Sequence, residues 1–303
     1  MNRSWPRVVA VAGVPAAAVV AGGAVLGGAA GAVLALALVA SVPPLALFLA
    51  GRVALSALRA RPVGEVEYPQ LYRVVRELSK AARLPVPRIY VSPARQPSSL
   101  AIGHSRRAAR VCCTEGLLQL LTADELRGVL GHELAHVRER DTVATSFCAG
   151  LTAAITSLAS PAWLAPPGTR LNFLGAAADP GPADPGPADP GTAGPRANRL
   201  ALSLVGPVAA ALLQLSLSRG REYRADAVGA TLAGDPLALA RALRKIEART
   251  VELPLALTGP HVSASPLMIV DPFTGEGLTR WFATHPPTTE RVFRLEALAG
   301  YPR

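Results

Sequence analysis

The chain has 303 residues, of which 50% are hydrophobic and only 17% charged, and its mean hydropathy is positive at +0.31. This composition excludes an ordinary soluble domain and indicates an integral membrane protein. The net charge of +10 does not indicate nucleic-acid binding, because the basic residues are spread along the chain and aromatic residues, which stack on bases, make up only 5%. Basic residues cluster at the ends of the apolar segments, so we expect a lipid bilayer, and no nucleic acid, among the partners.

The N-terminal region, residues 1–60, is predicted to form a pair of transmembrane helices. Residues 8–51 are 44 consecutive positions without a charged side chain, whereas one crossing of a bilayer needs only about 20. A cleaved secretory signal would share the basic start at Arg3 and Arg7. Its apolar core of roughly 7 to 15 residues would leave most of this run unexplained, so the sequence favours two spans.

Residues 61–141 are predicted to be the first part of a domain outside the membrane. Apolar residues recur at helical spacing over 68–84, which indicates an amphipathic helix packed on a core. Three short segments rich in β-formers follow and are bounded by Pro, Gly or Arg: 88–93, 98–103 and 109–114. They predict a small β-sheet, so the expected fold class is α+β, mainly α.

A metal-binding pattern lies in the helix that is predicted to start at Thr122. The run from Thr122 to Glu125 is a capping box, so the helix continues through "GHELAH" to His136. With about 3.6 residues per turn, His132 and His136 lie on the same face and can reach one metal ion, for which zinc is the natural fit. Glu133 is offset by about 100 degrees, near enough to activate a water molecule as general base. The alternative is an ordinary helix with polar residues on its wet face.

Residues 142–218 contain the predicted third and fourth spans. Segment 143–165 is long enough to cross a membrane, whereas 200–218 is short and interrupted by Gly-Pro; a buried helical hairpin is the alternative for both. Between them, 176–196 repeats Ala-Asp-Pro-Gly-Pro, which predicts a disordered external loop because this composition cannot bury a core. Basic residues at the outer ends of each apolar pair predict that both termini and the metal site face the cytoplasm.

A catalytic zinc ion takes three protein ligands and keeps a fourth position open, so a third ligand is required. The second part of the domain, 219–303, begins within "SRGREYRADA", where Glu222 and Asp226 are four residues apart on one face of a predicted helix. Taken alone, these carboxylates could belong to an exposed, salt-bridged face. Their position directly after the fourth apolar segment, in a chain that still lacks a third ligand, favours metal binding.

The cysteines and the remaining histidines show no pattern of a site. Cys112 and Cys113 are adjacent, which is a poor arrangement for a disulfide bond, and Cys148 lies in an apolar run, so all three are predicted as small buried residues. His104 and His261 have no partner pattern and are predicted to lie at the surface. The lack of a disulfide framework agrees with a domain in the cytoplasm.

These elements together resemble the HtpX family of membrane-integrated zinc metalloproteases, relatives of the CAAX prenyl endopeptidases. The resemblance runs from the N-terminal apolar pair through "TEGLLQLLTADELRGVLGHELAH", "SRGREYRADA" and "SPLMIVDP" to "THPPTTERV". It implies that His132, His136 and Glu222 bind one Zn²⁺ ion and that Glu133 is the general base.

The same resemblance implies supporting roles for three residues. Asp226 would contact a ligating histidine and fix its tautomer. In the family, His285 and Arg291 of the "HPPxxxR" element lie near the active site. His285 could donate a hydrogen bond to the oxyanion of the reaction, or it could equally be a residue at the start of a helix.

One segment departs from the family pattern. "PSSLAIG" occupies the place of an Asn-Ala-Phe-Ala type strand beside the zinc cleft, so Ser98 stands where Asn is usual and Leu100 where Phe is usual. We expect an extended substrate to pair with Ser98, Ser99, Leu100 and Ala101 through backbone hydrogen bonds, a mode that demands little sequence specificity.

The sequence therefore predicts a membrane-bound zinc-dependent endopeptidase, multi-pass in a bacterial cell membrane, that hydrolyses peptide bonds of membrane or misfolded proteins at the cytoplasmic face. The charged run "VRERD" after the second histidine places the motif at or outside the membrane interface, which argues against cleavage within the membrane. The alternatives are a CAAX-type or peptide-processing membrane protease, and a non-enzymatic scaffold with a vestigial zinc site. No pattern indicates an oligomeric state.

Overall fold

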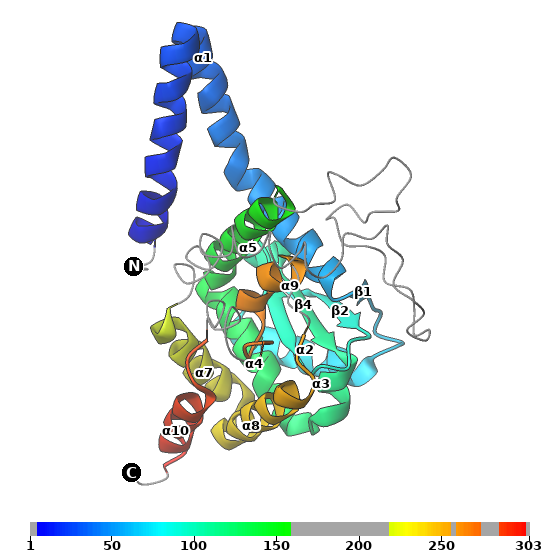
Figure 1. Cartoon of the computed structure of the whole chain (residues 1–303). Helices are drawn as coiled ribbons and strands as arrows, with labels where there is room; N and C mark the ends of the chain where they lie inside the picture. Colours follow the sequence, from blue (N-terminus) through cyan, green and yellow to red (C-terminus); the bar gives the residue numbers. More distant parts are fainter. Residues whose placement is uncertain (1–4, 159–217, 256–258, 274–284, 301–303) are drawn as a thin grey trace.

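The computed structural model describes residues 5–158, 218–255, 259–273 and 285–300. In these residues a long helical hairpin stands out from a mainly helical α+β domain with a small mixed sheet (Figure 1). The predicted mainly helical α+β class with a small β-sheet is therefore confirmed. The Asp-Pro-Gly repeat and all but the last residue of the predicted fourth span lie outside the described residues.

The hairpin is α1, Trp5–Ala57, which is interrupted where Gly27 and Gly28 leave helical geometry. Gly28 has φ +57°, a left-handed conformation that L side chains rarely adopt, so the chain can reverse there. Just beyond the turn the two arms touch, since a Cβ on Gly31 would lie 2.1 Å from the Gly23 oxygen. Each arm exceeds 20 residues, which at about 1.5 Å per residue is enough to cross a hydrocarbon core of about 30 Å.

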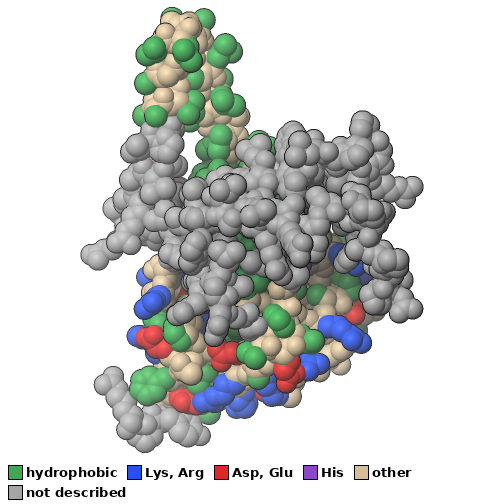
Figure 2. All heavy atoms as spheres, viewed as in Figure 1, with side chains coloured by type: hydrophobic (Ala, Val, Ile, Leu, Met, Phe, Trp, Pro, Cys, Tyr) green, Lys and Arg blue, Asp and Glu red, His purple; other side chains and the backbone are tan. Residues whose placement is uncertain are grey.

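The surface of this hairpin is apolar. Among the described residues, the segment Ala16–Ala57 is the one helix long and apolar enough to cross a membrane, by length and composition. Figure 2 shows hydrophobic side chains around the projecting arms, and Leu26 at the tip is 91% exposed. The other large exposed apolar side chains of α1 are Val19, Val25, Val33, Leu34, Leu36, Leu38, Val42, Leu45 and Phe48.

The sheet contains four short strands in the order β1-β2-β4-β3. They are β1 (Arg61–Pro62), β2 (Arg88–Ser92), β3 (Ser99–Ile102) and β4 (Arg110–Thr114). β2 and β4 are parallel, whereas β1 and β3 are antiparallel to their neighbours. The three predicted strands are confirmed, and β3 lies at the edge of the sheet that faces the site described below.

Helix α4 (Ala123–Glu139) is central, because it packs against α2, α7, α8 and β3. The predicted amphipathic helix is α2, whose buried side chains include Leu71, Val75 and Leu78. The other helical elements in the described ranges are α2 (Pro69–Ala82), η1 (Arg106–Ala108), α3 (Glu115–Leu120), α5 (Asp141–Leu158), α7 (Arg219–Ala233), α8 (Pro236–Glu252), α9 (Gly259–Ala264), η3 (Ser265–Leu267) and α10 (Thr288–Leu298).

The base of the hairpin is built into the domain. Helix α5, the described part of the predicted third span, packs closely on the second arm of α1, since a Cβ on Gly150 would lie 1.8 Å from the Ala46 oxygen. His261 is half-buried, and its Nε2 lies 3.2 Å from the Ala57 carbonyl oxygen. The prediction that His261 is a surface residue is wrong, because α9 packs against the end of α1. His104 is exposed as predicted.

The cysteines behave as small core residues. Cys112, Cys113 and Cys148 are buried and form no disulfide bond in the described part of the chain. Burial raises the pKa of the Cys112 thiol to about 12, so it remains protonated at neutral pH. The predicted packing role is confirmed.

Candidate metal centre

Local interactions at its two ends determine where the helix that carries the histidines begins and ends. The Thr122 hydroxyl accepts a hydrogen bond from the Glu125 N–H at 3.4 Å, and the Glu125 carboxylate accepts one from the Thr122 N–H at 2.9 Å, so the predicted capping box is confirmed. The helix ends at Arg140, which has φ +61°. This left-handed residue turns the chain sharply into α5 and brings Asp141 back toward the end of α4.

Two glycines allow α7 to cross α4 at close range. A Cβ on Gly131 would lie 2.6 Å from the Gly229 oxygen, and a Cβ on Gly229 would lie 2.5 Å from the His132 nitrogen. Any larger residue would push the two helices apart. The close crossing brings Glu222 and Asp226 of α7 beside the histidines of α4.

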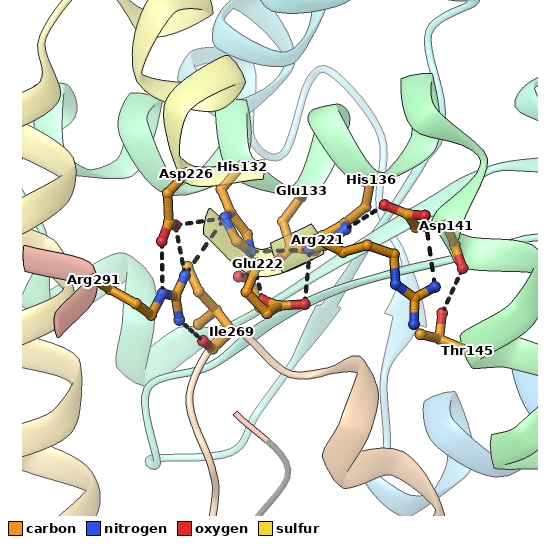
Figure 3. A network of polar contacts seen from close by, with 11 residues as sticks. His132, Glu133, His136, Asp141, Thr145, Arg221, Glu222, Asp226, Ile269 and Arg291 are labelled. Atoms are coloured by element: carbon orange, nitrogen blue, oxygen red, sulfur yellow. Dashed lines mark hydrogen bonds and ion pairs between the residues drawn. The ribbon is translucent and has the colours of Figure 1, made fainter. Parts of the chain in front are cut away.

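Three donor atoms converge on one point (Figure 3). The Nε2 atoms of His132 and His136 are 3.1 Å apart. Glu222 places Oε2 at 3.7 Å from the His132 Nε2 and Oε1 at 3.6 Å from the His136 Nε2. The two distances to Glu222 end on different carboxylate oxygens, and one ligand atom from each residue forms a triangle with all atoms within 4.8 Å of one another. Zinc bonds of about 2.0–2.1 Å in a tetrahedron separate ligand atoms by about 3.4 Å, so the triangle can close on the metal through adjustment of the Glu222 side chain.

The charges around these atoms favour a cation. Glu222 is buried, and its Oε2 has no hydrogen-bond partner in the described part of the chain, which is costly for a carboxylate unless a cation is bound. Burial alone would raise the pKa of Glu222, but the nearby histidines, His136 foremost, together hold that pKa well below its usual range. Burial also opposes a charge on His136, yet Glu222, Asp141 and Glu133 together raise the pKa of His136 to about 10.

Glu133 lies on α4 between the two histidines and does not belong to this triangle. It is 2% exposed, and its Oε1 accepts a hydrogen bond from the Ser99 hydroxyl at 2.6 Å. Burial raises the pKa of Glu133, against the lowering effect of the two histidines and Ser99. A carboxylate whose pKa is moved toward neutrality is suited to accept and return a proton.

On one side of the site, Asp226 and Arg291 support His132. The Nδ1 atom of His132 lies 2.9 Å from Oδ1 of Asp226. Arg291 donates to both oxygens of Asp226, at 2.8 and 2.7 Å, and to the Ile269 carbonyl at 2.6 Å. Burial opposes the charge of Asp226, but Arg291 lowers its pKa to about 2, so a carboxylate accepts the Nδ1 hydrogen and leaves Nε2 for a metal.

On the other side, the structure adds two residues that the sequence analysis missed. Asp141 places Oδ2 at 3.7 Å from Nδ1 of His136, and Nη1 of Arg221 lies 3.6 Å from Oδ1 of Asp141. The signal was present in the sequence, because Asp141 follows the histidine motif by one helical turn and Arg221 precedes Glu222. The sequence did not show that the chain turns at Arg140 and brings Asp141 back toward His136.

His285 lines the same cavity as the histidines, Glu133 and Glu222. It precedes α10 by three residues, so it does not start that helix. Burial, reinforced by the nearby charges of Arg291 and the histidines, lowers the pKa of His285 to about 4 despite the opposing effect of Glu222. The imidazole is therefore neutral at pH 7 and can donate a hydrogen bond into the cavity.

The predicted substrate strand, Ser98 to Ala101, coincides with β3 and the residue before it. Part of the outer edge of this strand is already paired with another segment of the protein. The Ile269 N–H donates to the Ser99 carbonyl at 3.1 Å, and Leu100 lies opposite Met268. Ala101 lines the cavity. Any backbone pairing by a substrate is thereby limited to the Ala101 end of the strand, unless the segment at Met268 moves.

Comparisons with known proteins identify relatives of this chain. The model of "Peptidase family M48" matches residues 65–299. A "Protease HtpX homolog" of Kineococcus radiotolerans is 51% identical over 253 residues, which are 82% of this chain and 80% of the relative. Another, of Pelotomaculum thermopropionicum, is 41% identical over 290 residues, 95% of this chain and 96% of the relative. The crystal structure of S. mikatae Ste24p superposes with a TM-score of 0.49 at 18% identity, covering 97% of this chain and 65% of that one.

Proposed function

Since this chain belongs to peptidase family M48 and is a membrane metalloprotease, we propose that it is a zinc-dependent endopeptidase. The observation that carries the proposal is the triangle of ligand atoms, one each from His132, His136 and Glu222, which lie within 4.8 Å of one another and form the donor set of a catalytic zinc site. An intact ligand set argues against a vestigial scaffold. Relatives named as HtpX proteases argue against a dedicated CAAX-type or peptide-processing enzyme.

The residues around the triangle of ligand atoms have different roles in the hydrolysis of a peptide bond. Zinc held there would lower the pKa of a water molecule and polarise the scissile carbonyl. Glu133 takes a proton from the attacking water and returns it to the leaving amine. Neutral His285 donates a hydrogen bond to the oxyanion that develops on the carbonyl. The Ala101 end of the strand aligns an extended polypeptide beside the metal, because Ala101 lines the cavity.

The membrane placement is also a proposal. The exposed apolar surface of α1 supports a pair of transmembrane helices that turn at Gly27 and Gly28. Basic residues at the outer ends of the apolar segments support a multi-pass protein with its catalytic domain in the cytoplasm. Substrates are then membrane proteins or misfolded polypeptides that reach the cytoplasmic face, and the bilayer is a permanent partner.

Cysteine labelling in intact cells tests this orientation. An impermeant thiol reagent should label a cysteine placed at Leu26, at the tip of the hairpin, and should not label one placed at Arg249. The three native cysteines are buried and provide a low background. The reverse pattern would show that the catalytic domain faces outward.

Separating the two glutamates tests the enzymatic proposal. Glu133→Gln should keep one zinc ion per chain and lose about a hundredfold to ten-thousandfold in activity, because the ligands remain while the general base is removed. Glu222→Gln should lose zinc affinity and activity together. Protein purified in detergent would be assayed for zinc by elemental analysis and for cleavage of an unfolded polypeptide. Wild-type turnover by zinc-loaded Glu133→Gln, or full zinc and activity in Glu222→Gln, would contradict the assignment.

A further inference from the structure

The hydroxyl of Ser99 makes a direct contact with the glutamate of the histidine motif. Its Oγ donates to Oε1 of Glu133 at 2.6 Å, and the two residues are 1% and 2% exposed. A short hydrogen bond to a carboxylate that is shielded from water is stronger than one between neutral groups at the surface. Ser99 was predicted only as a backbone partner of the substrate, so its side chain has no role in that prediction.

The backbone of Ser99 is held on both sides. Ser99 pairs with Cys113 across the β3–β4 ladder, and its carbonyl oxygen accepts from the Ile269 N–H at 3.1 Å. With the main chain fixed between β4 and the Met268 segment, the hydroxyl presents a donor at a constant position against α4. A donor on such a fixed strand can define the orientation of its acceptor.

The need for such a donor follows from the position of Glu133. A long carboxylate side chain in a site lined by other charged groups has several rotamers, and only some of them bring an oxygen near the attacking water. Binding Oε1 to Ser99 leaves Oε2 as the oxygen that can accept the proton. Glu133 lines the cavity together with His132 and His136, so this second oxygen belongs to a side chain at the reaction site.

We infer that Ser99 is a positioning residue, whose hydroxyl holds the carboxylate of Glu133 in the orientation that general-base catalysis requires. The inference rests on the proposed function, because it assigns Glu133 as the base. It connects a residue of β3 to a catalytic group on α4. Strand β3 would then have a second role besides alignment of the substrate.

A second buried serine provides a matched control. Ser79 of α2 is 0% exposed, and its Oγ has no hydrogen-bond partner in the described part of the chain. Ser79→Ala and Ser99→Ala therefore remove the same atom from buried positions, and only the second change removes a contact with Glu133. Ser99→Thr retains the hydroxyl and suits a strand, so it serves as the rescue variant.

The experiment compares these variants as zinc-loaded full-length protein in detergent, with kcat, KM, bound zinc and melting temperature measured for each. Ser99→Ala should lower kcat about 10-fold to 100-fold, the effect of losing one hydrogen bond to a charged group, with KM and zinc content unchanged. Ser99→Thr should recover most of kcat, and Ser79→Ala should match the wild type. In a Glu133→Gln background, Ser99→Ala should add no further loss, because the hydroxyl acts through the carboxylate.

Four results would overturn the inference: an unchanged kcat in Ser99→Ala, a loss confined to KM, a loss that follows zinc content or melting temperature, or an equal loss in Ser79→Ala. The first would show that Glu133 is oriented without Ser99, and the second would assign the side chain to substrate binding. Failure of the proposed function is distinguishable, since the wild type would then show no zinc-dependent cleavage that Glu133→Gln abolishes.

Discussion

His132 and His136 direct their Nε2 atoms to the same point, but their opposite ring nitrogens have different surroundings. The Nδ1 of His132 lies 2.9 Å from Asp226, which Arg291 holds through two hydrogen bonds. The Nδ1 of His136 lies 3.7 Å from Asp141, beyond hydrogen-bonding distance. The side chain of His132 is 1% exposed and that of His136 is 17% exposed.

The difference reflects how each side is built. The His132 side brings together α4, α7, α10 and the segment at Ile269. Its geometry is therefore set by packing between elements that are far apart in the sequence. The His136 side depends on the turn at Arg140 and on residues where α5 and α7 begin. One ligand is thus held rigidly before metal binding, while the other keeps freedom to adjust its ring. We expect substitutions on the two sides to have unequal effects, and three of them can be ranked.

The largest expected effect comes from removing Arg291. It is 1% exposed, and Arg291→Met would leave the Asp226 carboxylate buried without its cation and the Ile269 carbonyl without its donor. Breaking a buried pair in this way destabilises a fold by about 3–5 kcal/mol. Urea titration of the purified protein should show this loss in the free energy of unfolding.

The control for that loss removes both charges together. Asp226→Leu combined with Arg291→Met replaces the pair by apolar side chains, which is often nearly neutral for stability. The double variant should recover most of the free energy of unfolding while binding zinc poorly. A double variant as unstable as the single one would show that shape, and not the unpaired charge, accounts for the loss.

The second effect concerns metal affinity on the rigid side. Asp226→Asn keeps the shape of the side chain but removes the charge that accepts the Nδ1 hydrogen of His132. Substitutions of this kind lower metal affinity about 10-fold to 100-fold, and chelator competition would measure the change. Asp235→Asn, at the exposed N-terminus of α8, is the matched control, because Asn caps a helix as well as Asp. Equal zinc affinity in both variants would remove Asp226 from the metal site.

The sequence predicted the parts of this site that lie within one helix. His132, Glu133 and His136 are placed by helical periodicity, and their helix starts at a capping box that is visible in the sequence. Glu222 lies about 90 positions away, and its approach depends on the contact of Gly131 with Gly229. The need for a third ligand and the family resemblance linked it to the histidines, whereas helical periodicity did not. The periodicity of residues along one helix does not predict where that helix crosses another.

The missed features share a different cause. The strand at Ser99 was predicted, but its side-chain contact with Glu133 and its backbone contact with Ile269 depend on the position of an edge strand relative to distant segments. His261 has no sequence pattern at all, and its burial follows from α9 packing on the end of α1. Asp141 depends on one left-handed residue, Arg140, at a position where glycine is usual.

The smallest expected effect is on the adjustable side. Asp141→Asn removes a charge that lies 3.7 Å from His136, where attraction acts through space and no direct hydrogen bond is lost. The pair is largely buried, with side chains 17% and 9% exposed, but no hydrogen bond joins it, so zinc affinity should fall by less than the roughly 10-fold to 100-fold expected for Asp226→Asn. The same chelator competition used for Asp226→Asn would measure it. A loss as large as that of Asp226→Asn would mean that the α4–α5 turn closes on His136 when metal binds, and that the two histidines are held alike in the loaded enzyme.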